Sequence, residues 1–283
     1  MTTVADLRRE GRALLAASPA HTGPREATLL LGRVLGLSEA QLLARPGLQV
    51  GEPDRARYRA LLARRARGEP VAYLLGSREF FGRSFLVDRR VLIPRPETEH
   101  LVAAALAEVG DRRAVAVDVG TGSGCVAITL ALEAPAVRVV ASDLSLAALA
   151  LARSNARRLA AERATRFVAA DLLAGLDLRA IDLVVSNPPY VDPGAAATLP
   201  PDVREHEPPS ALFAPQGGLG HLRRLLAAAR DLRSGAALIV EIGAGQAEAV
   251  VALASEALEV EGVDRDYAGI ERVVRMRRVA RRR

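Results

Sequence analysis

The sequence predicts an α/β protein in which a small helical region precedes an open sheet of seven strands, the last two antiparallel. Apolar residues recur at helical spacing in the first quarter of the chain. From Ala114 onward, short apolar runs alternate with helical stretches, as in a parallel sheet with crossover helices. Only DRDYAG separates the final two runs, which is too short for a crossover helix, so these runs must pair antiparallel.

The N-terminal region has the pattern of amphipathic helices. Val4 and Leu7 begin an apolar series at helical spacing. Ser38 with Gln41 three residues later forms a capping-box pattern, which predicts that a helix begins there. We therefore expect a helical bundle over residues 1–75.

A short β-rich segment follows the helices. The run EFFGRSFLVDRRVLIP is aromatic and β-branched, and Gly82 near its middle favours a turn, so residues 76–94 are expected to form a hairpin linker. We assign residues 95–283 to the sheet domain. Its expected strands cover residues 114–119, 137–142, 165–169, 181–186, 236–242, 258–263 and 270–276.

Composition excludes several classes of protein. Half of the 283 residues are apolar, which is enough for a full core and a small second domain. No apolar run approaches the roughly 18 residues of a membrane span, and the residues after Met1 lack a signal-peptide pattern. A single cysteine, Cys125, leaves no internal disulfide and no multi-cysteine zinc site. We therefore expect a cytoplasmic protein with no membrane partner.

The histidines do not indicate a metal site. No pair has a ligand spacing such as HExxH, so no metal is expected and the histidines are assigned structural or solvent-exposed roles. The four are His21, His100, His206 and His221.

The formal charge of +6 is concentrated at the C-terminus. Residues 272–283 hold seven arginines and no acidic residue, and the rest of the chain is close to neutral. We interpret this arginine segment as a solvated end, with weak RNA or ribosome contact as the alternative.

A glycine-rich loop follows the first predicted strand of the sheet. It consists of Gly120, Thr121, Gly122, Ser123 and Gly124. Glycines permit positive φ and the close approach of a ligand, and the N–H groups at a helix start attract polar or anionic groups. A simple tight turn is the alternative role. Cys125 stands where the dinucleotide fingerprint GxGxxG has its third glycine, and the observed GxGxG favours a cofactor without a pyrophosphate.

Acidic residues follow the next two predicted strands. Asp143 lies 23 residues beyond Gly120, close to the spacing of an acid that binds ribose hydroxyls. Asp171 follows the third strand, where it is suited to accept a hydrogen bond from an adenine amino group. A helix cap is the alternative role for each carboxylate. Three adjacent strands that all end in such loops favour a nucleoside cofactor.

The residues that decide the chemistry are Asn187, Pro188, Pro189 and Tyr190, directly after an apolar strand. Each proline forces the preceding residue into an extended conformation, so the side-chain oxygen of Asn187 and the carbonyl oxygen of Pro188 are held fixed. Both oxygens are acceptors suited to an NH₂ group, and the Tyr190 ring is suited to pack on a planar amide.

An amide or aromatic amine nitrogen is a poor nucleophile because its lone pair is delocalised. Acceptors on both N–H bonds localise that lone pair, and preorganised oxygens stabilise the positive charge that moves from sulfur to nitrogen when a sulfonium methyl group is attacked. Alignment of two bound reactants contributes about 7 to 11 kcal/mol more. We therefore predict methyl transfer from S-adenosylmethionine to such a nitrogen, with residues 187–190 as the catalytic set.

Further segments extend the pattern along the chain. They are PVAYLLGSREFFG (70–82), LIPRPETE (92–99), DVGTGSG (118–124), Asp143, Asn155, VVSNPPYV (184–191), EHEPPSAL (205–212), VEIGAGQ (240–246) and DYAGIERVV (266–274). On these segments the chain resembles the HemK family of peptide chain release factor glutamine methyltransferases.

The resemblance implies a class I S-adenosylmethionine-dependent methyltransferase fold, Rossmann-like with seven strands, behind an N-terminal helical domain that recognises the release factor. It implies methylation of the glutamine in the Gly-Gly-Gln loop of class I peptide chain release factors. It also implies cofactor contacts at Gly120 to Gly124, Asp143, Asp171 with Leu172, and Asn187.

The chain departs from the family pattern at two places. Leu172 stands where family members can carry an aromatic residue beside the adenine. In the segment from Pro215 to Arg224, Gly220, His221 and Leu222 replace an acidic and aromatic run.

Other functions share parts of these patterns. A glutamine methyltransferase acting on a ribosomal protein would share NPPY, but LIPRPETE argues against it. A DNA adenine methyltransferase would need a target-reading region larger than the residues from Val191 to Gly217. An NAD-dependent oxidoreductase would explain Asp143 but not Asn187. A non-catalytic tRNA- or ribosome-binding module would depend on the arginine segment alone.

Overall fold

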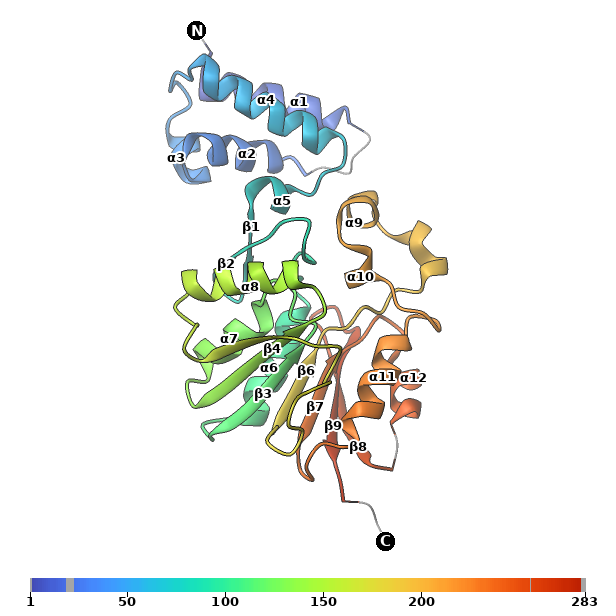
Figure 1. The fold of residues 1–283 in the computed structure, drawn as a ribbon. Coiled ribbons are helices and arrows are strands. Elements are labelled where there is room, and N and C mark those ends of the chain that lie inside the picture. Colours follow the sequence, from blue (N-terminus) through green and yellow to red (C-terminus); the bar gives the residue numbers. More distant parts are fainter. Residues whose placement is uncertain (1, 19–22, 255, 281–283) are drawn as a thin grey trace. The chain divides into compact units, whose positions relative to one another are not determined.

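The computed structural model describes residues 2–18, 23–254 and 256–280 (Figure 1). Contacts divide the chain into two compact units. The smaller unit comprises the residues up to Ser77 together with Thr198–Glu207, and the larger unit comprises Arg78–Ala197 and the residues from Pro208 onward.

The smaller unit is helical. Its helices are α1 (Val4–Ala16), α2 (Glu26–Leu35), α3 (Glu39–Ala44), α4 (Glu52–Ala66), α5 (Val71–Leu75) and α9 (Pro201–His206). Ser38 and Gln41 form the capping box that the sequence predicts, and Thr3 with Asp6 forms a second one at the start of α1. These caps satisfy backbone N–H groups that a helix start leaves without partners.

Tyr58 is the central residue of this unit. Its side chain is fully buried, and its hydroxyl donates to the carbonyl oxygens of Leu7 at 3.2 Å and Ala27 at 3.1 Å. These contacts join α4 to α1 and α2. Gly11 leaves the space for the ring, because a Cβ on Gly11 would lie 2.0 Å from the Tyr58 hydroxyl oxygen.

The larger unit begins with a two-stranded hairpin and continues with the sheet. The hairpin strands are β1 (Ser77–Phe80) and β2 (Arg83–Leu86). The sheet strands are β3 (Ala114–Val119), β4 (Val137–Asp143), β5 (Thr165–Ala169), β6 (Leu183–Ser186), β7 (Ala237–Glu241), β8 (Leu258–Arg265) and β9 (Glu271–Arg278). All seven predicted sheet strands are present, with bounds that differ from the predicted ones by at most two residues.

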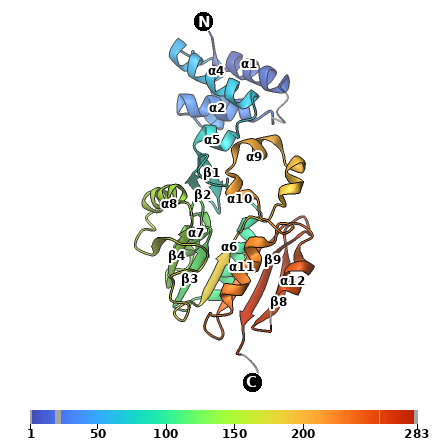
Figure 2. The same ribbon diagram turned by 45° about the vertical axis from the view of Figure 1, so that its right-hand side comes forward.

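The strand order in the sheet is β5-β4-β3-β6-β7-β9-β8. Figure 2 shows β4 and β3 toward one edge of the sheet and β9 and β8 toward the other. Strands β3 to β7 pair in parallel, whereas β9 pairs antiparallel with both β7 and β8. The predicted fold class is therefore confirmed. The chain order reverses at β3, which lies between β4 and β6, and a sheet of this kind binds its ligand outside the carboxyl ends of the strands at such a point.

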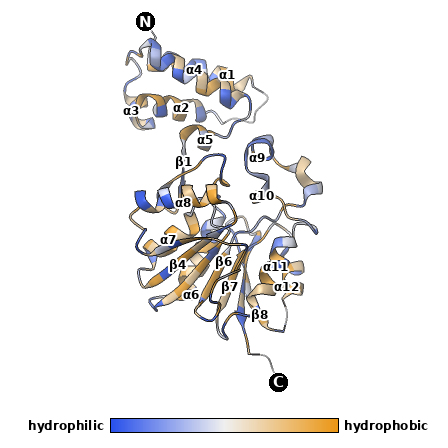
Figure 3. Cartoon of the chain, in the orientation of Figure 1, coloured by the Kyte–Doolittle hydropathy of each residue, from blue (hydrophilic) through white to orange (hydrophobic). Residues whose placement is uncertain are grey.

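Helices cover both faces of the sheet. One face packs against α6 (Thr98–Val109), α7 (Cys125–Glu133) and α8 (Leu146–Arg158), and the other against α11 (Gly220–Ala229) and α12 (Ala247–Leu253). Neighbouring residues of β6 alternate between the two cores: Leu183 and Val185 belong to the first, and Val184 to the second. The inner strands β6 and β7 are accordingly buried and largely hydrophobic on both faces (Figure 3). The remaining short elements are η1 (Pro193–Thr198) and α10 (Pro209–Leu212).

The interpretation of residues 272–283 as a solvated end is wrong for the part that the structure describes. Val273, Val274 and Met276 are fully buried and hold β9 inside the sheet. The four arginines of β9 form ion pairs or hydrogen bonds with neighbouring residues. The partners are Asp266 for Arg272, Asp264 for Arg275, Glu108 and Glu261 for Arg277, and the carbonyl oxygen of Arg230 for Arg278.

In the described part of the chain, no helix is both long and apolar enough to cross a membrane.

We expect Gly11→Ala to destabilise the protein by about 1 to 3 kcal/mol, because the new methyl group meets the buried Tyr58 hydroxyl. Tyr58→Phe removes that hydroxyl and costs on the order of 1 kcal/mol by itself, since two carbonyl groups lose their donor. Gly11→Ala should therefore cost less in the Tyr58→Phe background. Urea unfolding of the four proteins measures this, and strictly additive costs would contradict the assigned contact.

Candidate active site

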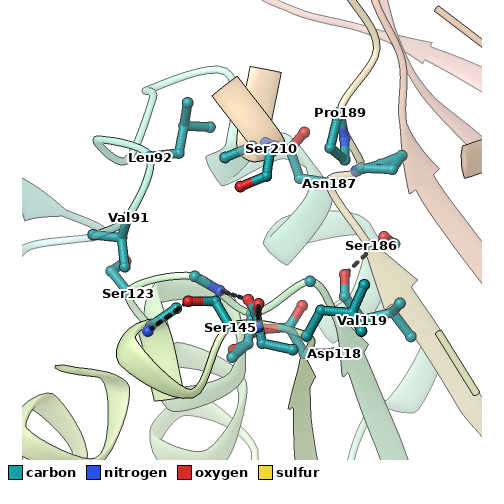
Figure 4. Close-up of a pocket in the computed structure, with 18 of the residues that line it drawn as sticks. Val91, Leu92, Asp118, Val119, Ser123, Ser145, Ser186, Asn187, Pro189 and Ser210 are labelled. Atoms are coloured by element: carbon teal, nitrogen blue, oxygen red, sulfur yellow. Dashed lines mark hydrogen bonds between the residues drawn. The ribbon is translucent and has the colours of Figure 1, made fainter. Parts of the chain in front are cut away.

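A cavity opens at the carboxyl ends of the parallel strands, inside the larger unit (Figure 4). Its lining comes from the loops after β3, β4, β5 and β6, from residues 90–98 before and at the start of α6, and from residues 208–213. Figure 4 shows Asn187, Pro189 and Ser210 on one side of this cavity, across from Asp118 and Ser145. The sheet thus brings together the loops that the sequence singles out.

The glycine-rich loop lies between β3 and α7. Gly120, Gly122 and Gly124 all have positive φ, at 75°, 54° and 82°. The N–H groups of Gly120 and Thr121 both donate to the carbonyl oxygen of Ser142 at 2.9 Å, so β4 fixes the loop. A Cβ on Gly120 or Gly122 would meet nothing within 4 Å, which leaves open space beside the backbone at these positions. Four of the five loop residues line the cavity, and Gly124 instead caps α7.

Asp118 is the buried acid beneath this loop. Its Oδ2 accepts hydrogen bonds from the Thr121 hydroxyl at 2.6 Å and from the Ala127 N–H at 3.1 Å. Burial raises the pKa of Asp118 to about 7, against the opposing effect of these two donors. The carboxyl group therefore links the glycine-rich loop to the first turn of α7.

Asp143 ends β4 and lines the cavity. Its two carboxylate oxygens accept from the N–H of Gly122 at 2.9 Å and from the N–H of Ser145 at 2.8 Å. The cap of α8 is Ser145, whose hydroxyl accepts from the Ala148 N–H, so Asp143 is not the capping residue. Each Asp143 oxygen retains a further lone pair for a donor in the cavity.

Asp171 and Leu172 line the cavity after β5. Asp171 Oδ2 pairs with the Arg224 guanidinium, whereas Asp171 Oδ1 is buried and has no hydrogen-bond partner among the described residues. Leu172 has a φ of 55°, uncommon for a residue with a side chain, and its carbonyl oxygen accepts from Ser142 Oγ at 3.4 Å.

The loop after β6 contributes Asn187, Pro188 and Pro189 to the cavity. The side-chain nitrogen of Asn187 donates to the hydroxyl oxygen of Thr98 at 3.0 Å. No described residue donates to the Asn187 side-chain oxygen or to the Pro188 carbonyl oxygen. The two acceptors that the sequence predicts are thus both without a partner.

Tyr190 does not line this cavity. A Cβ on Gly243 would lie 3.1 Å from its ring, and its carbonyl oxygen accepts from the Gln246 side chain at 3.0 Å. Burial raises the pKa of Tyr190 to about 12. The predicted packing of this ring on a substrate amide stays a prediction.

Several lining residues lie outside the predicted set. Thr98 is one, and His221 is another, although the sequence assigned it a structural or solvent-exposed role. Burial lowers the pKa of His221, and the nearby Arg224 lowers it further. Ser210 and Phe213 come from the segment EHEPPSAL and its neighbour. The sequence indicates Ser210 and Phe213 only through their place in or beside EHEPPSAL, a motif for which no role was predicted.

The comparisons with known proteins agree with this geometry. Residues 6–76 match the model of the PrmC N-terminal domain, and residues 98–199 match the model of the methyltransferase small domain. The release factor glutamine methyltransferase of Nitratidesulfovibrio vulgaris is 40% identical over 98% of this chain and 95% of its own length. That of Bordetella pertussis is 45% identical over 88% of this chain and 92% of its own.

This chain belongs to the release factor glutamine methyltransferase family. The family resemblance drawn from the sequence motifs is therefore confirmed, and the chain is a methyltransferase that uses S-adenosylmethionine.

Solved structures agree on the fold. A methyltransferase from Pyrococcus furiosus has a TM-score of 0.54 at 16% identity and covers 77% of this chain and 98% of its own. The hMettl16 catalytic domain, solved with an RNA hairpin, has a TM-score of 0.56 at 15% identity and covers 85% of each chain.

The residues present fit this cofactor. Open space beside Gly120 and Gly122 admits a ligand close to the backbone. The free lone pairs of Asp143 suit two ribose hydroxyls.

We expect Asp118→Asn to change how stability depends on pH. The pKa of Asp118 is higher in the folded protein than in the unfolded chain. As the pH rises from about 4 to 7, the unfolded state loses this proton while the folded state keeps it, so the stability of the wild type falls. Asparagine can accept both existing hydrogen bonds through one oxygen and does not titrate. The difference in free energy of unfolding, variant minus wild type, should therefore rise by on the order of 3 kcal/mol from pH 4 to pH 8. Denaturant unfolding at several pH values measures this, and a constant difference would contradict it.

Proposed function

We propose that this chain transfers a methyl group from S-adenosylmethionine to the side-chain amide nitrogen of the glutamine in the Gly-Gly-Gln loop of class I peptide chain release factors. The observation that carries the proposal is the pair of unpartnered oxygens on Asn187 and Pro188 at the cofactor end of the sheet. The relatives that cover nearly the whole chain are named for this reaction, which supports the proposal.

The proposed mechanism uses this chain's residues to orient the two reactants. When bound, the cofactor supplies an electrophilic methyl group on a positively charged sulfur. The oxygens of Asn187 and Pro188 would accept hydrogen bonds from the two N–H groups of the glutamine amide. These bonds would localise the nitrogen lone pair and stabilise the positive charge that develops on nitrogen. Asp143 would bind the ribose hydroxyls, and Asp171 with Leu172 would lie beside the adenine. Residues 120–124 would form the backbone surface next to the cofactor. No strong base is required, because the methylated amide nitrogen loses its proton readily to water.

Recognition of the release factor is assigned to the helical region, residues 1–75, on the basis of the family. Residues 76–94 would serve as linker and residues 95–283 as the methyltransferase domain. The arginines of α4 give little support to an electrostatic docking face, because all five of them pair with acidic residues of the same unit. We place the reaction in the cytoplasm, where a release factor would be available as substrate.

Weak RNA or ribosome contact through residues 272–283 has less support. The four arginines of β9 are engaged within the larger unit, and residues 281–283 lie outside the described residues.

The function is tested by incubating the protein with methyl-labelled S-adenosylmethionine and a class I release factor that carries either the natural loop or glutamine replaced by alanine. We expect label only on the natural loop, located on the glutamine amide by mass spectrometry. Parallel samples contain ribosomal proteins or a DNA duplex. Label on either of these, with an unmodified release factor, would refute the proposal in favour of the ribosomal-protein or DNA adenine alternative.

Two substitutions separate cofactor binding from methyl transfer. Asp143→Ala should weaken S-adenosylmethionine binding about 10-fold or more, because hydrogen bonds to a charged group contribute about 1.5 to 3 kcal/mol each. Asn187→Ala should lower the turnover number about 100-fold or more while the cofactor dissociation constant changes much less. Calorimetric titration and single-turnover assays measure the two effects. Unaltered cofactor binding in the first variant, or unaltered turnover in the second, would refute the assigned role.

A further inference from the structure

The amide group of Asn187 is held by a chain of hydrogen bonds that begins at a buried carboxylate. Glu241, the last residue of β7, lies beside Thr98, and a hydrogen bond from the Thr98 hydroxyl lowers the pKa of Glu241 against the larger effect of burial. The Thr98 oxygen in turn accepts from the Asn187 side-chain nitrogen at 3.0 Å. Glu241 and Thr98 are 1% and 2% exposed, so water does not compete for these bonds.

We propose that Glu241 and Thr98 are positioning residues for methyl transfer, which fix the orientation of the Asn187 amide. This inference rests on the proposed function. A threonine hydroxyl has one proton, and we assign it to Glu241, the buried carboxylate beside it. The Thr98 oxygen is then only an acceptor toward Asn187, so the amide nitrogen must face Thr98 and the amide oxygen must face the substrate.

The orientation matters because an asparagine amide has a donor end and an acceptor end of nearly equal shape. Turned by 180°, Asn187 would present its own N–H group to the N–H of the substrate amide. That arrangement removes one of the two acceptors and opposes the positive charge that develops on the attacking nitrogen. Backbone rigidity from Pro188 and Pro189 fixes the position of Asn187 but not the rotation of its amide.

The burial of Glu241 supports a role in function over one in stability. One carboxylate oxygen, Oε2, is buried without a hydrogen-bond partner among the described residues. Burial raises the pKa of Glu241 to about 7, and the charge of Arg272 only partly opposes this. A buried carboxylate with an unsatisfied oxygen is costly for a strand end, where an apolar residue would pack without that cost. Such costs are typical of functional sites.

The segment VEIGAGQ, which contains Glu241, also contacts Tyr190 at the other end of the loop after β6. Gln246 donates to the Tyr190 carbonyl oxygen at 3.0 Å and accepts from the Gly243 N–H at 2.9 Å. Gly218 packs against the same carbonyl oxygen, because a Cβ on Gly218 would lie 2.1 Å from it. The motifs LIPRPETE and VEIGAGQ, which supply Thr98, Glu241 and Gln246, thereby acquire a common role beside the loop that follows β6.

The test compares Thr98→Val with Thr98→Ser. Valine keeps the shape of threonine but offers Asn187 no acceptor, whereas serine keeps the hydroxyl. We expect Thr98→Val to lower kcat about 10- to 100-fold. This decrease is smaller than the one that follows removal of a group that itself binds the transition state. The dissociation constant of S-adenosylmethionine and the KM for the release factor should change less than about 3-fold, and Thr98→Ser should recover most of kcat.

Thr129→Val is the matched control. Thr129 is also fully buried, and its hydroxyl has no partner among the described residues. The same chemical change there leaves the hydrogen bonds between Glu241, Thr98 and Asn187 intact. Glu241→Leu supplies the second arm: kcat should fall while the melting temperature stays equal or rises. Combined with Thr98→Val, it should add little further loss, because the two substitutions break one chain of bonds.

Wild-type kcat in Thr98→Val, or a Thr98→Ser variant as slow as Thr98→Val, would overturn the proposal. So would full additivity of Thr98→Val and Glu241→Leu. Failure of the proposed function gives a different result: the wild-type protein itself would leave the release factor unmethylated, which would overturn both proposals.

Discussion

The parallel pairing of β3 with both β4 and β6 is the constraint on which the rest of the site depends. It places the carboxyl ends of these strands at one edge of the sheet, at the point where the chain order reverses. The glycine-rich loop and Asn187 directly follow β3 and β6, and Asp143 is the last residue of β4. A register shift of one residue would exchange the two faces of a strand and move its loop away from the others.

The buried polar groups around this edge serve to hold loops at fixed positions. Asp118 joins the glycine-rich loop to α7, Asp143 joins it to β4, and Thr98 joins α6 to the loop after β6. In each case a side chain at the end of one element accepts bonds from another, so the cavity is shaped before a ligand enters. Preorganisation of this kind suits a reaction in which alignment of two reactants supplies much of the rate enhancement.

The parts that sequence could predict are those encoded locally. Asp143 and Asn187 follow apolar strands, and the topology of an open parallel sheet then brings them together without further information. The antiparallel end of the sheet followed from the six residues between its last two strands.

Contacts that depend on packing could not be predicted. Thr98 lies 89 residues before Asn187, and Arg224 lies 53 residues beyond Asp171. No local pattern specifies that α6 and α11 place these side chains at the sheet edge. The arginines near the C-terminus were misjudged for a related reason: their acidic partners, such as Glu108 and Glu261, are recognisable only once β8, β9 and α6 are packed.

The smaller unit is not a single stretch of chain. Thr198–Glu207 departs from the larger unit soon after the loop that carries Asn187, supplies α9, and returns before α10. An excised fragment ending at Ser77 would therefore lack part of its own structure. Exchange of the N-terminal region between relatives would be a two-site graft, in which the inserted helix must be transplanted with the bundle.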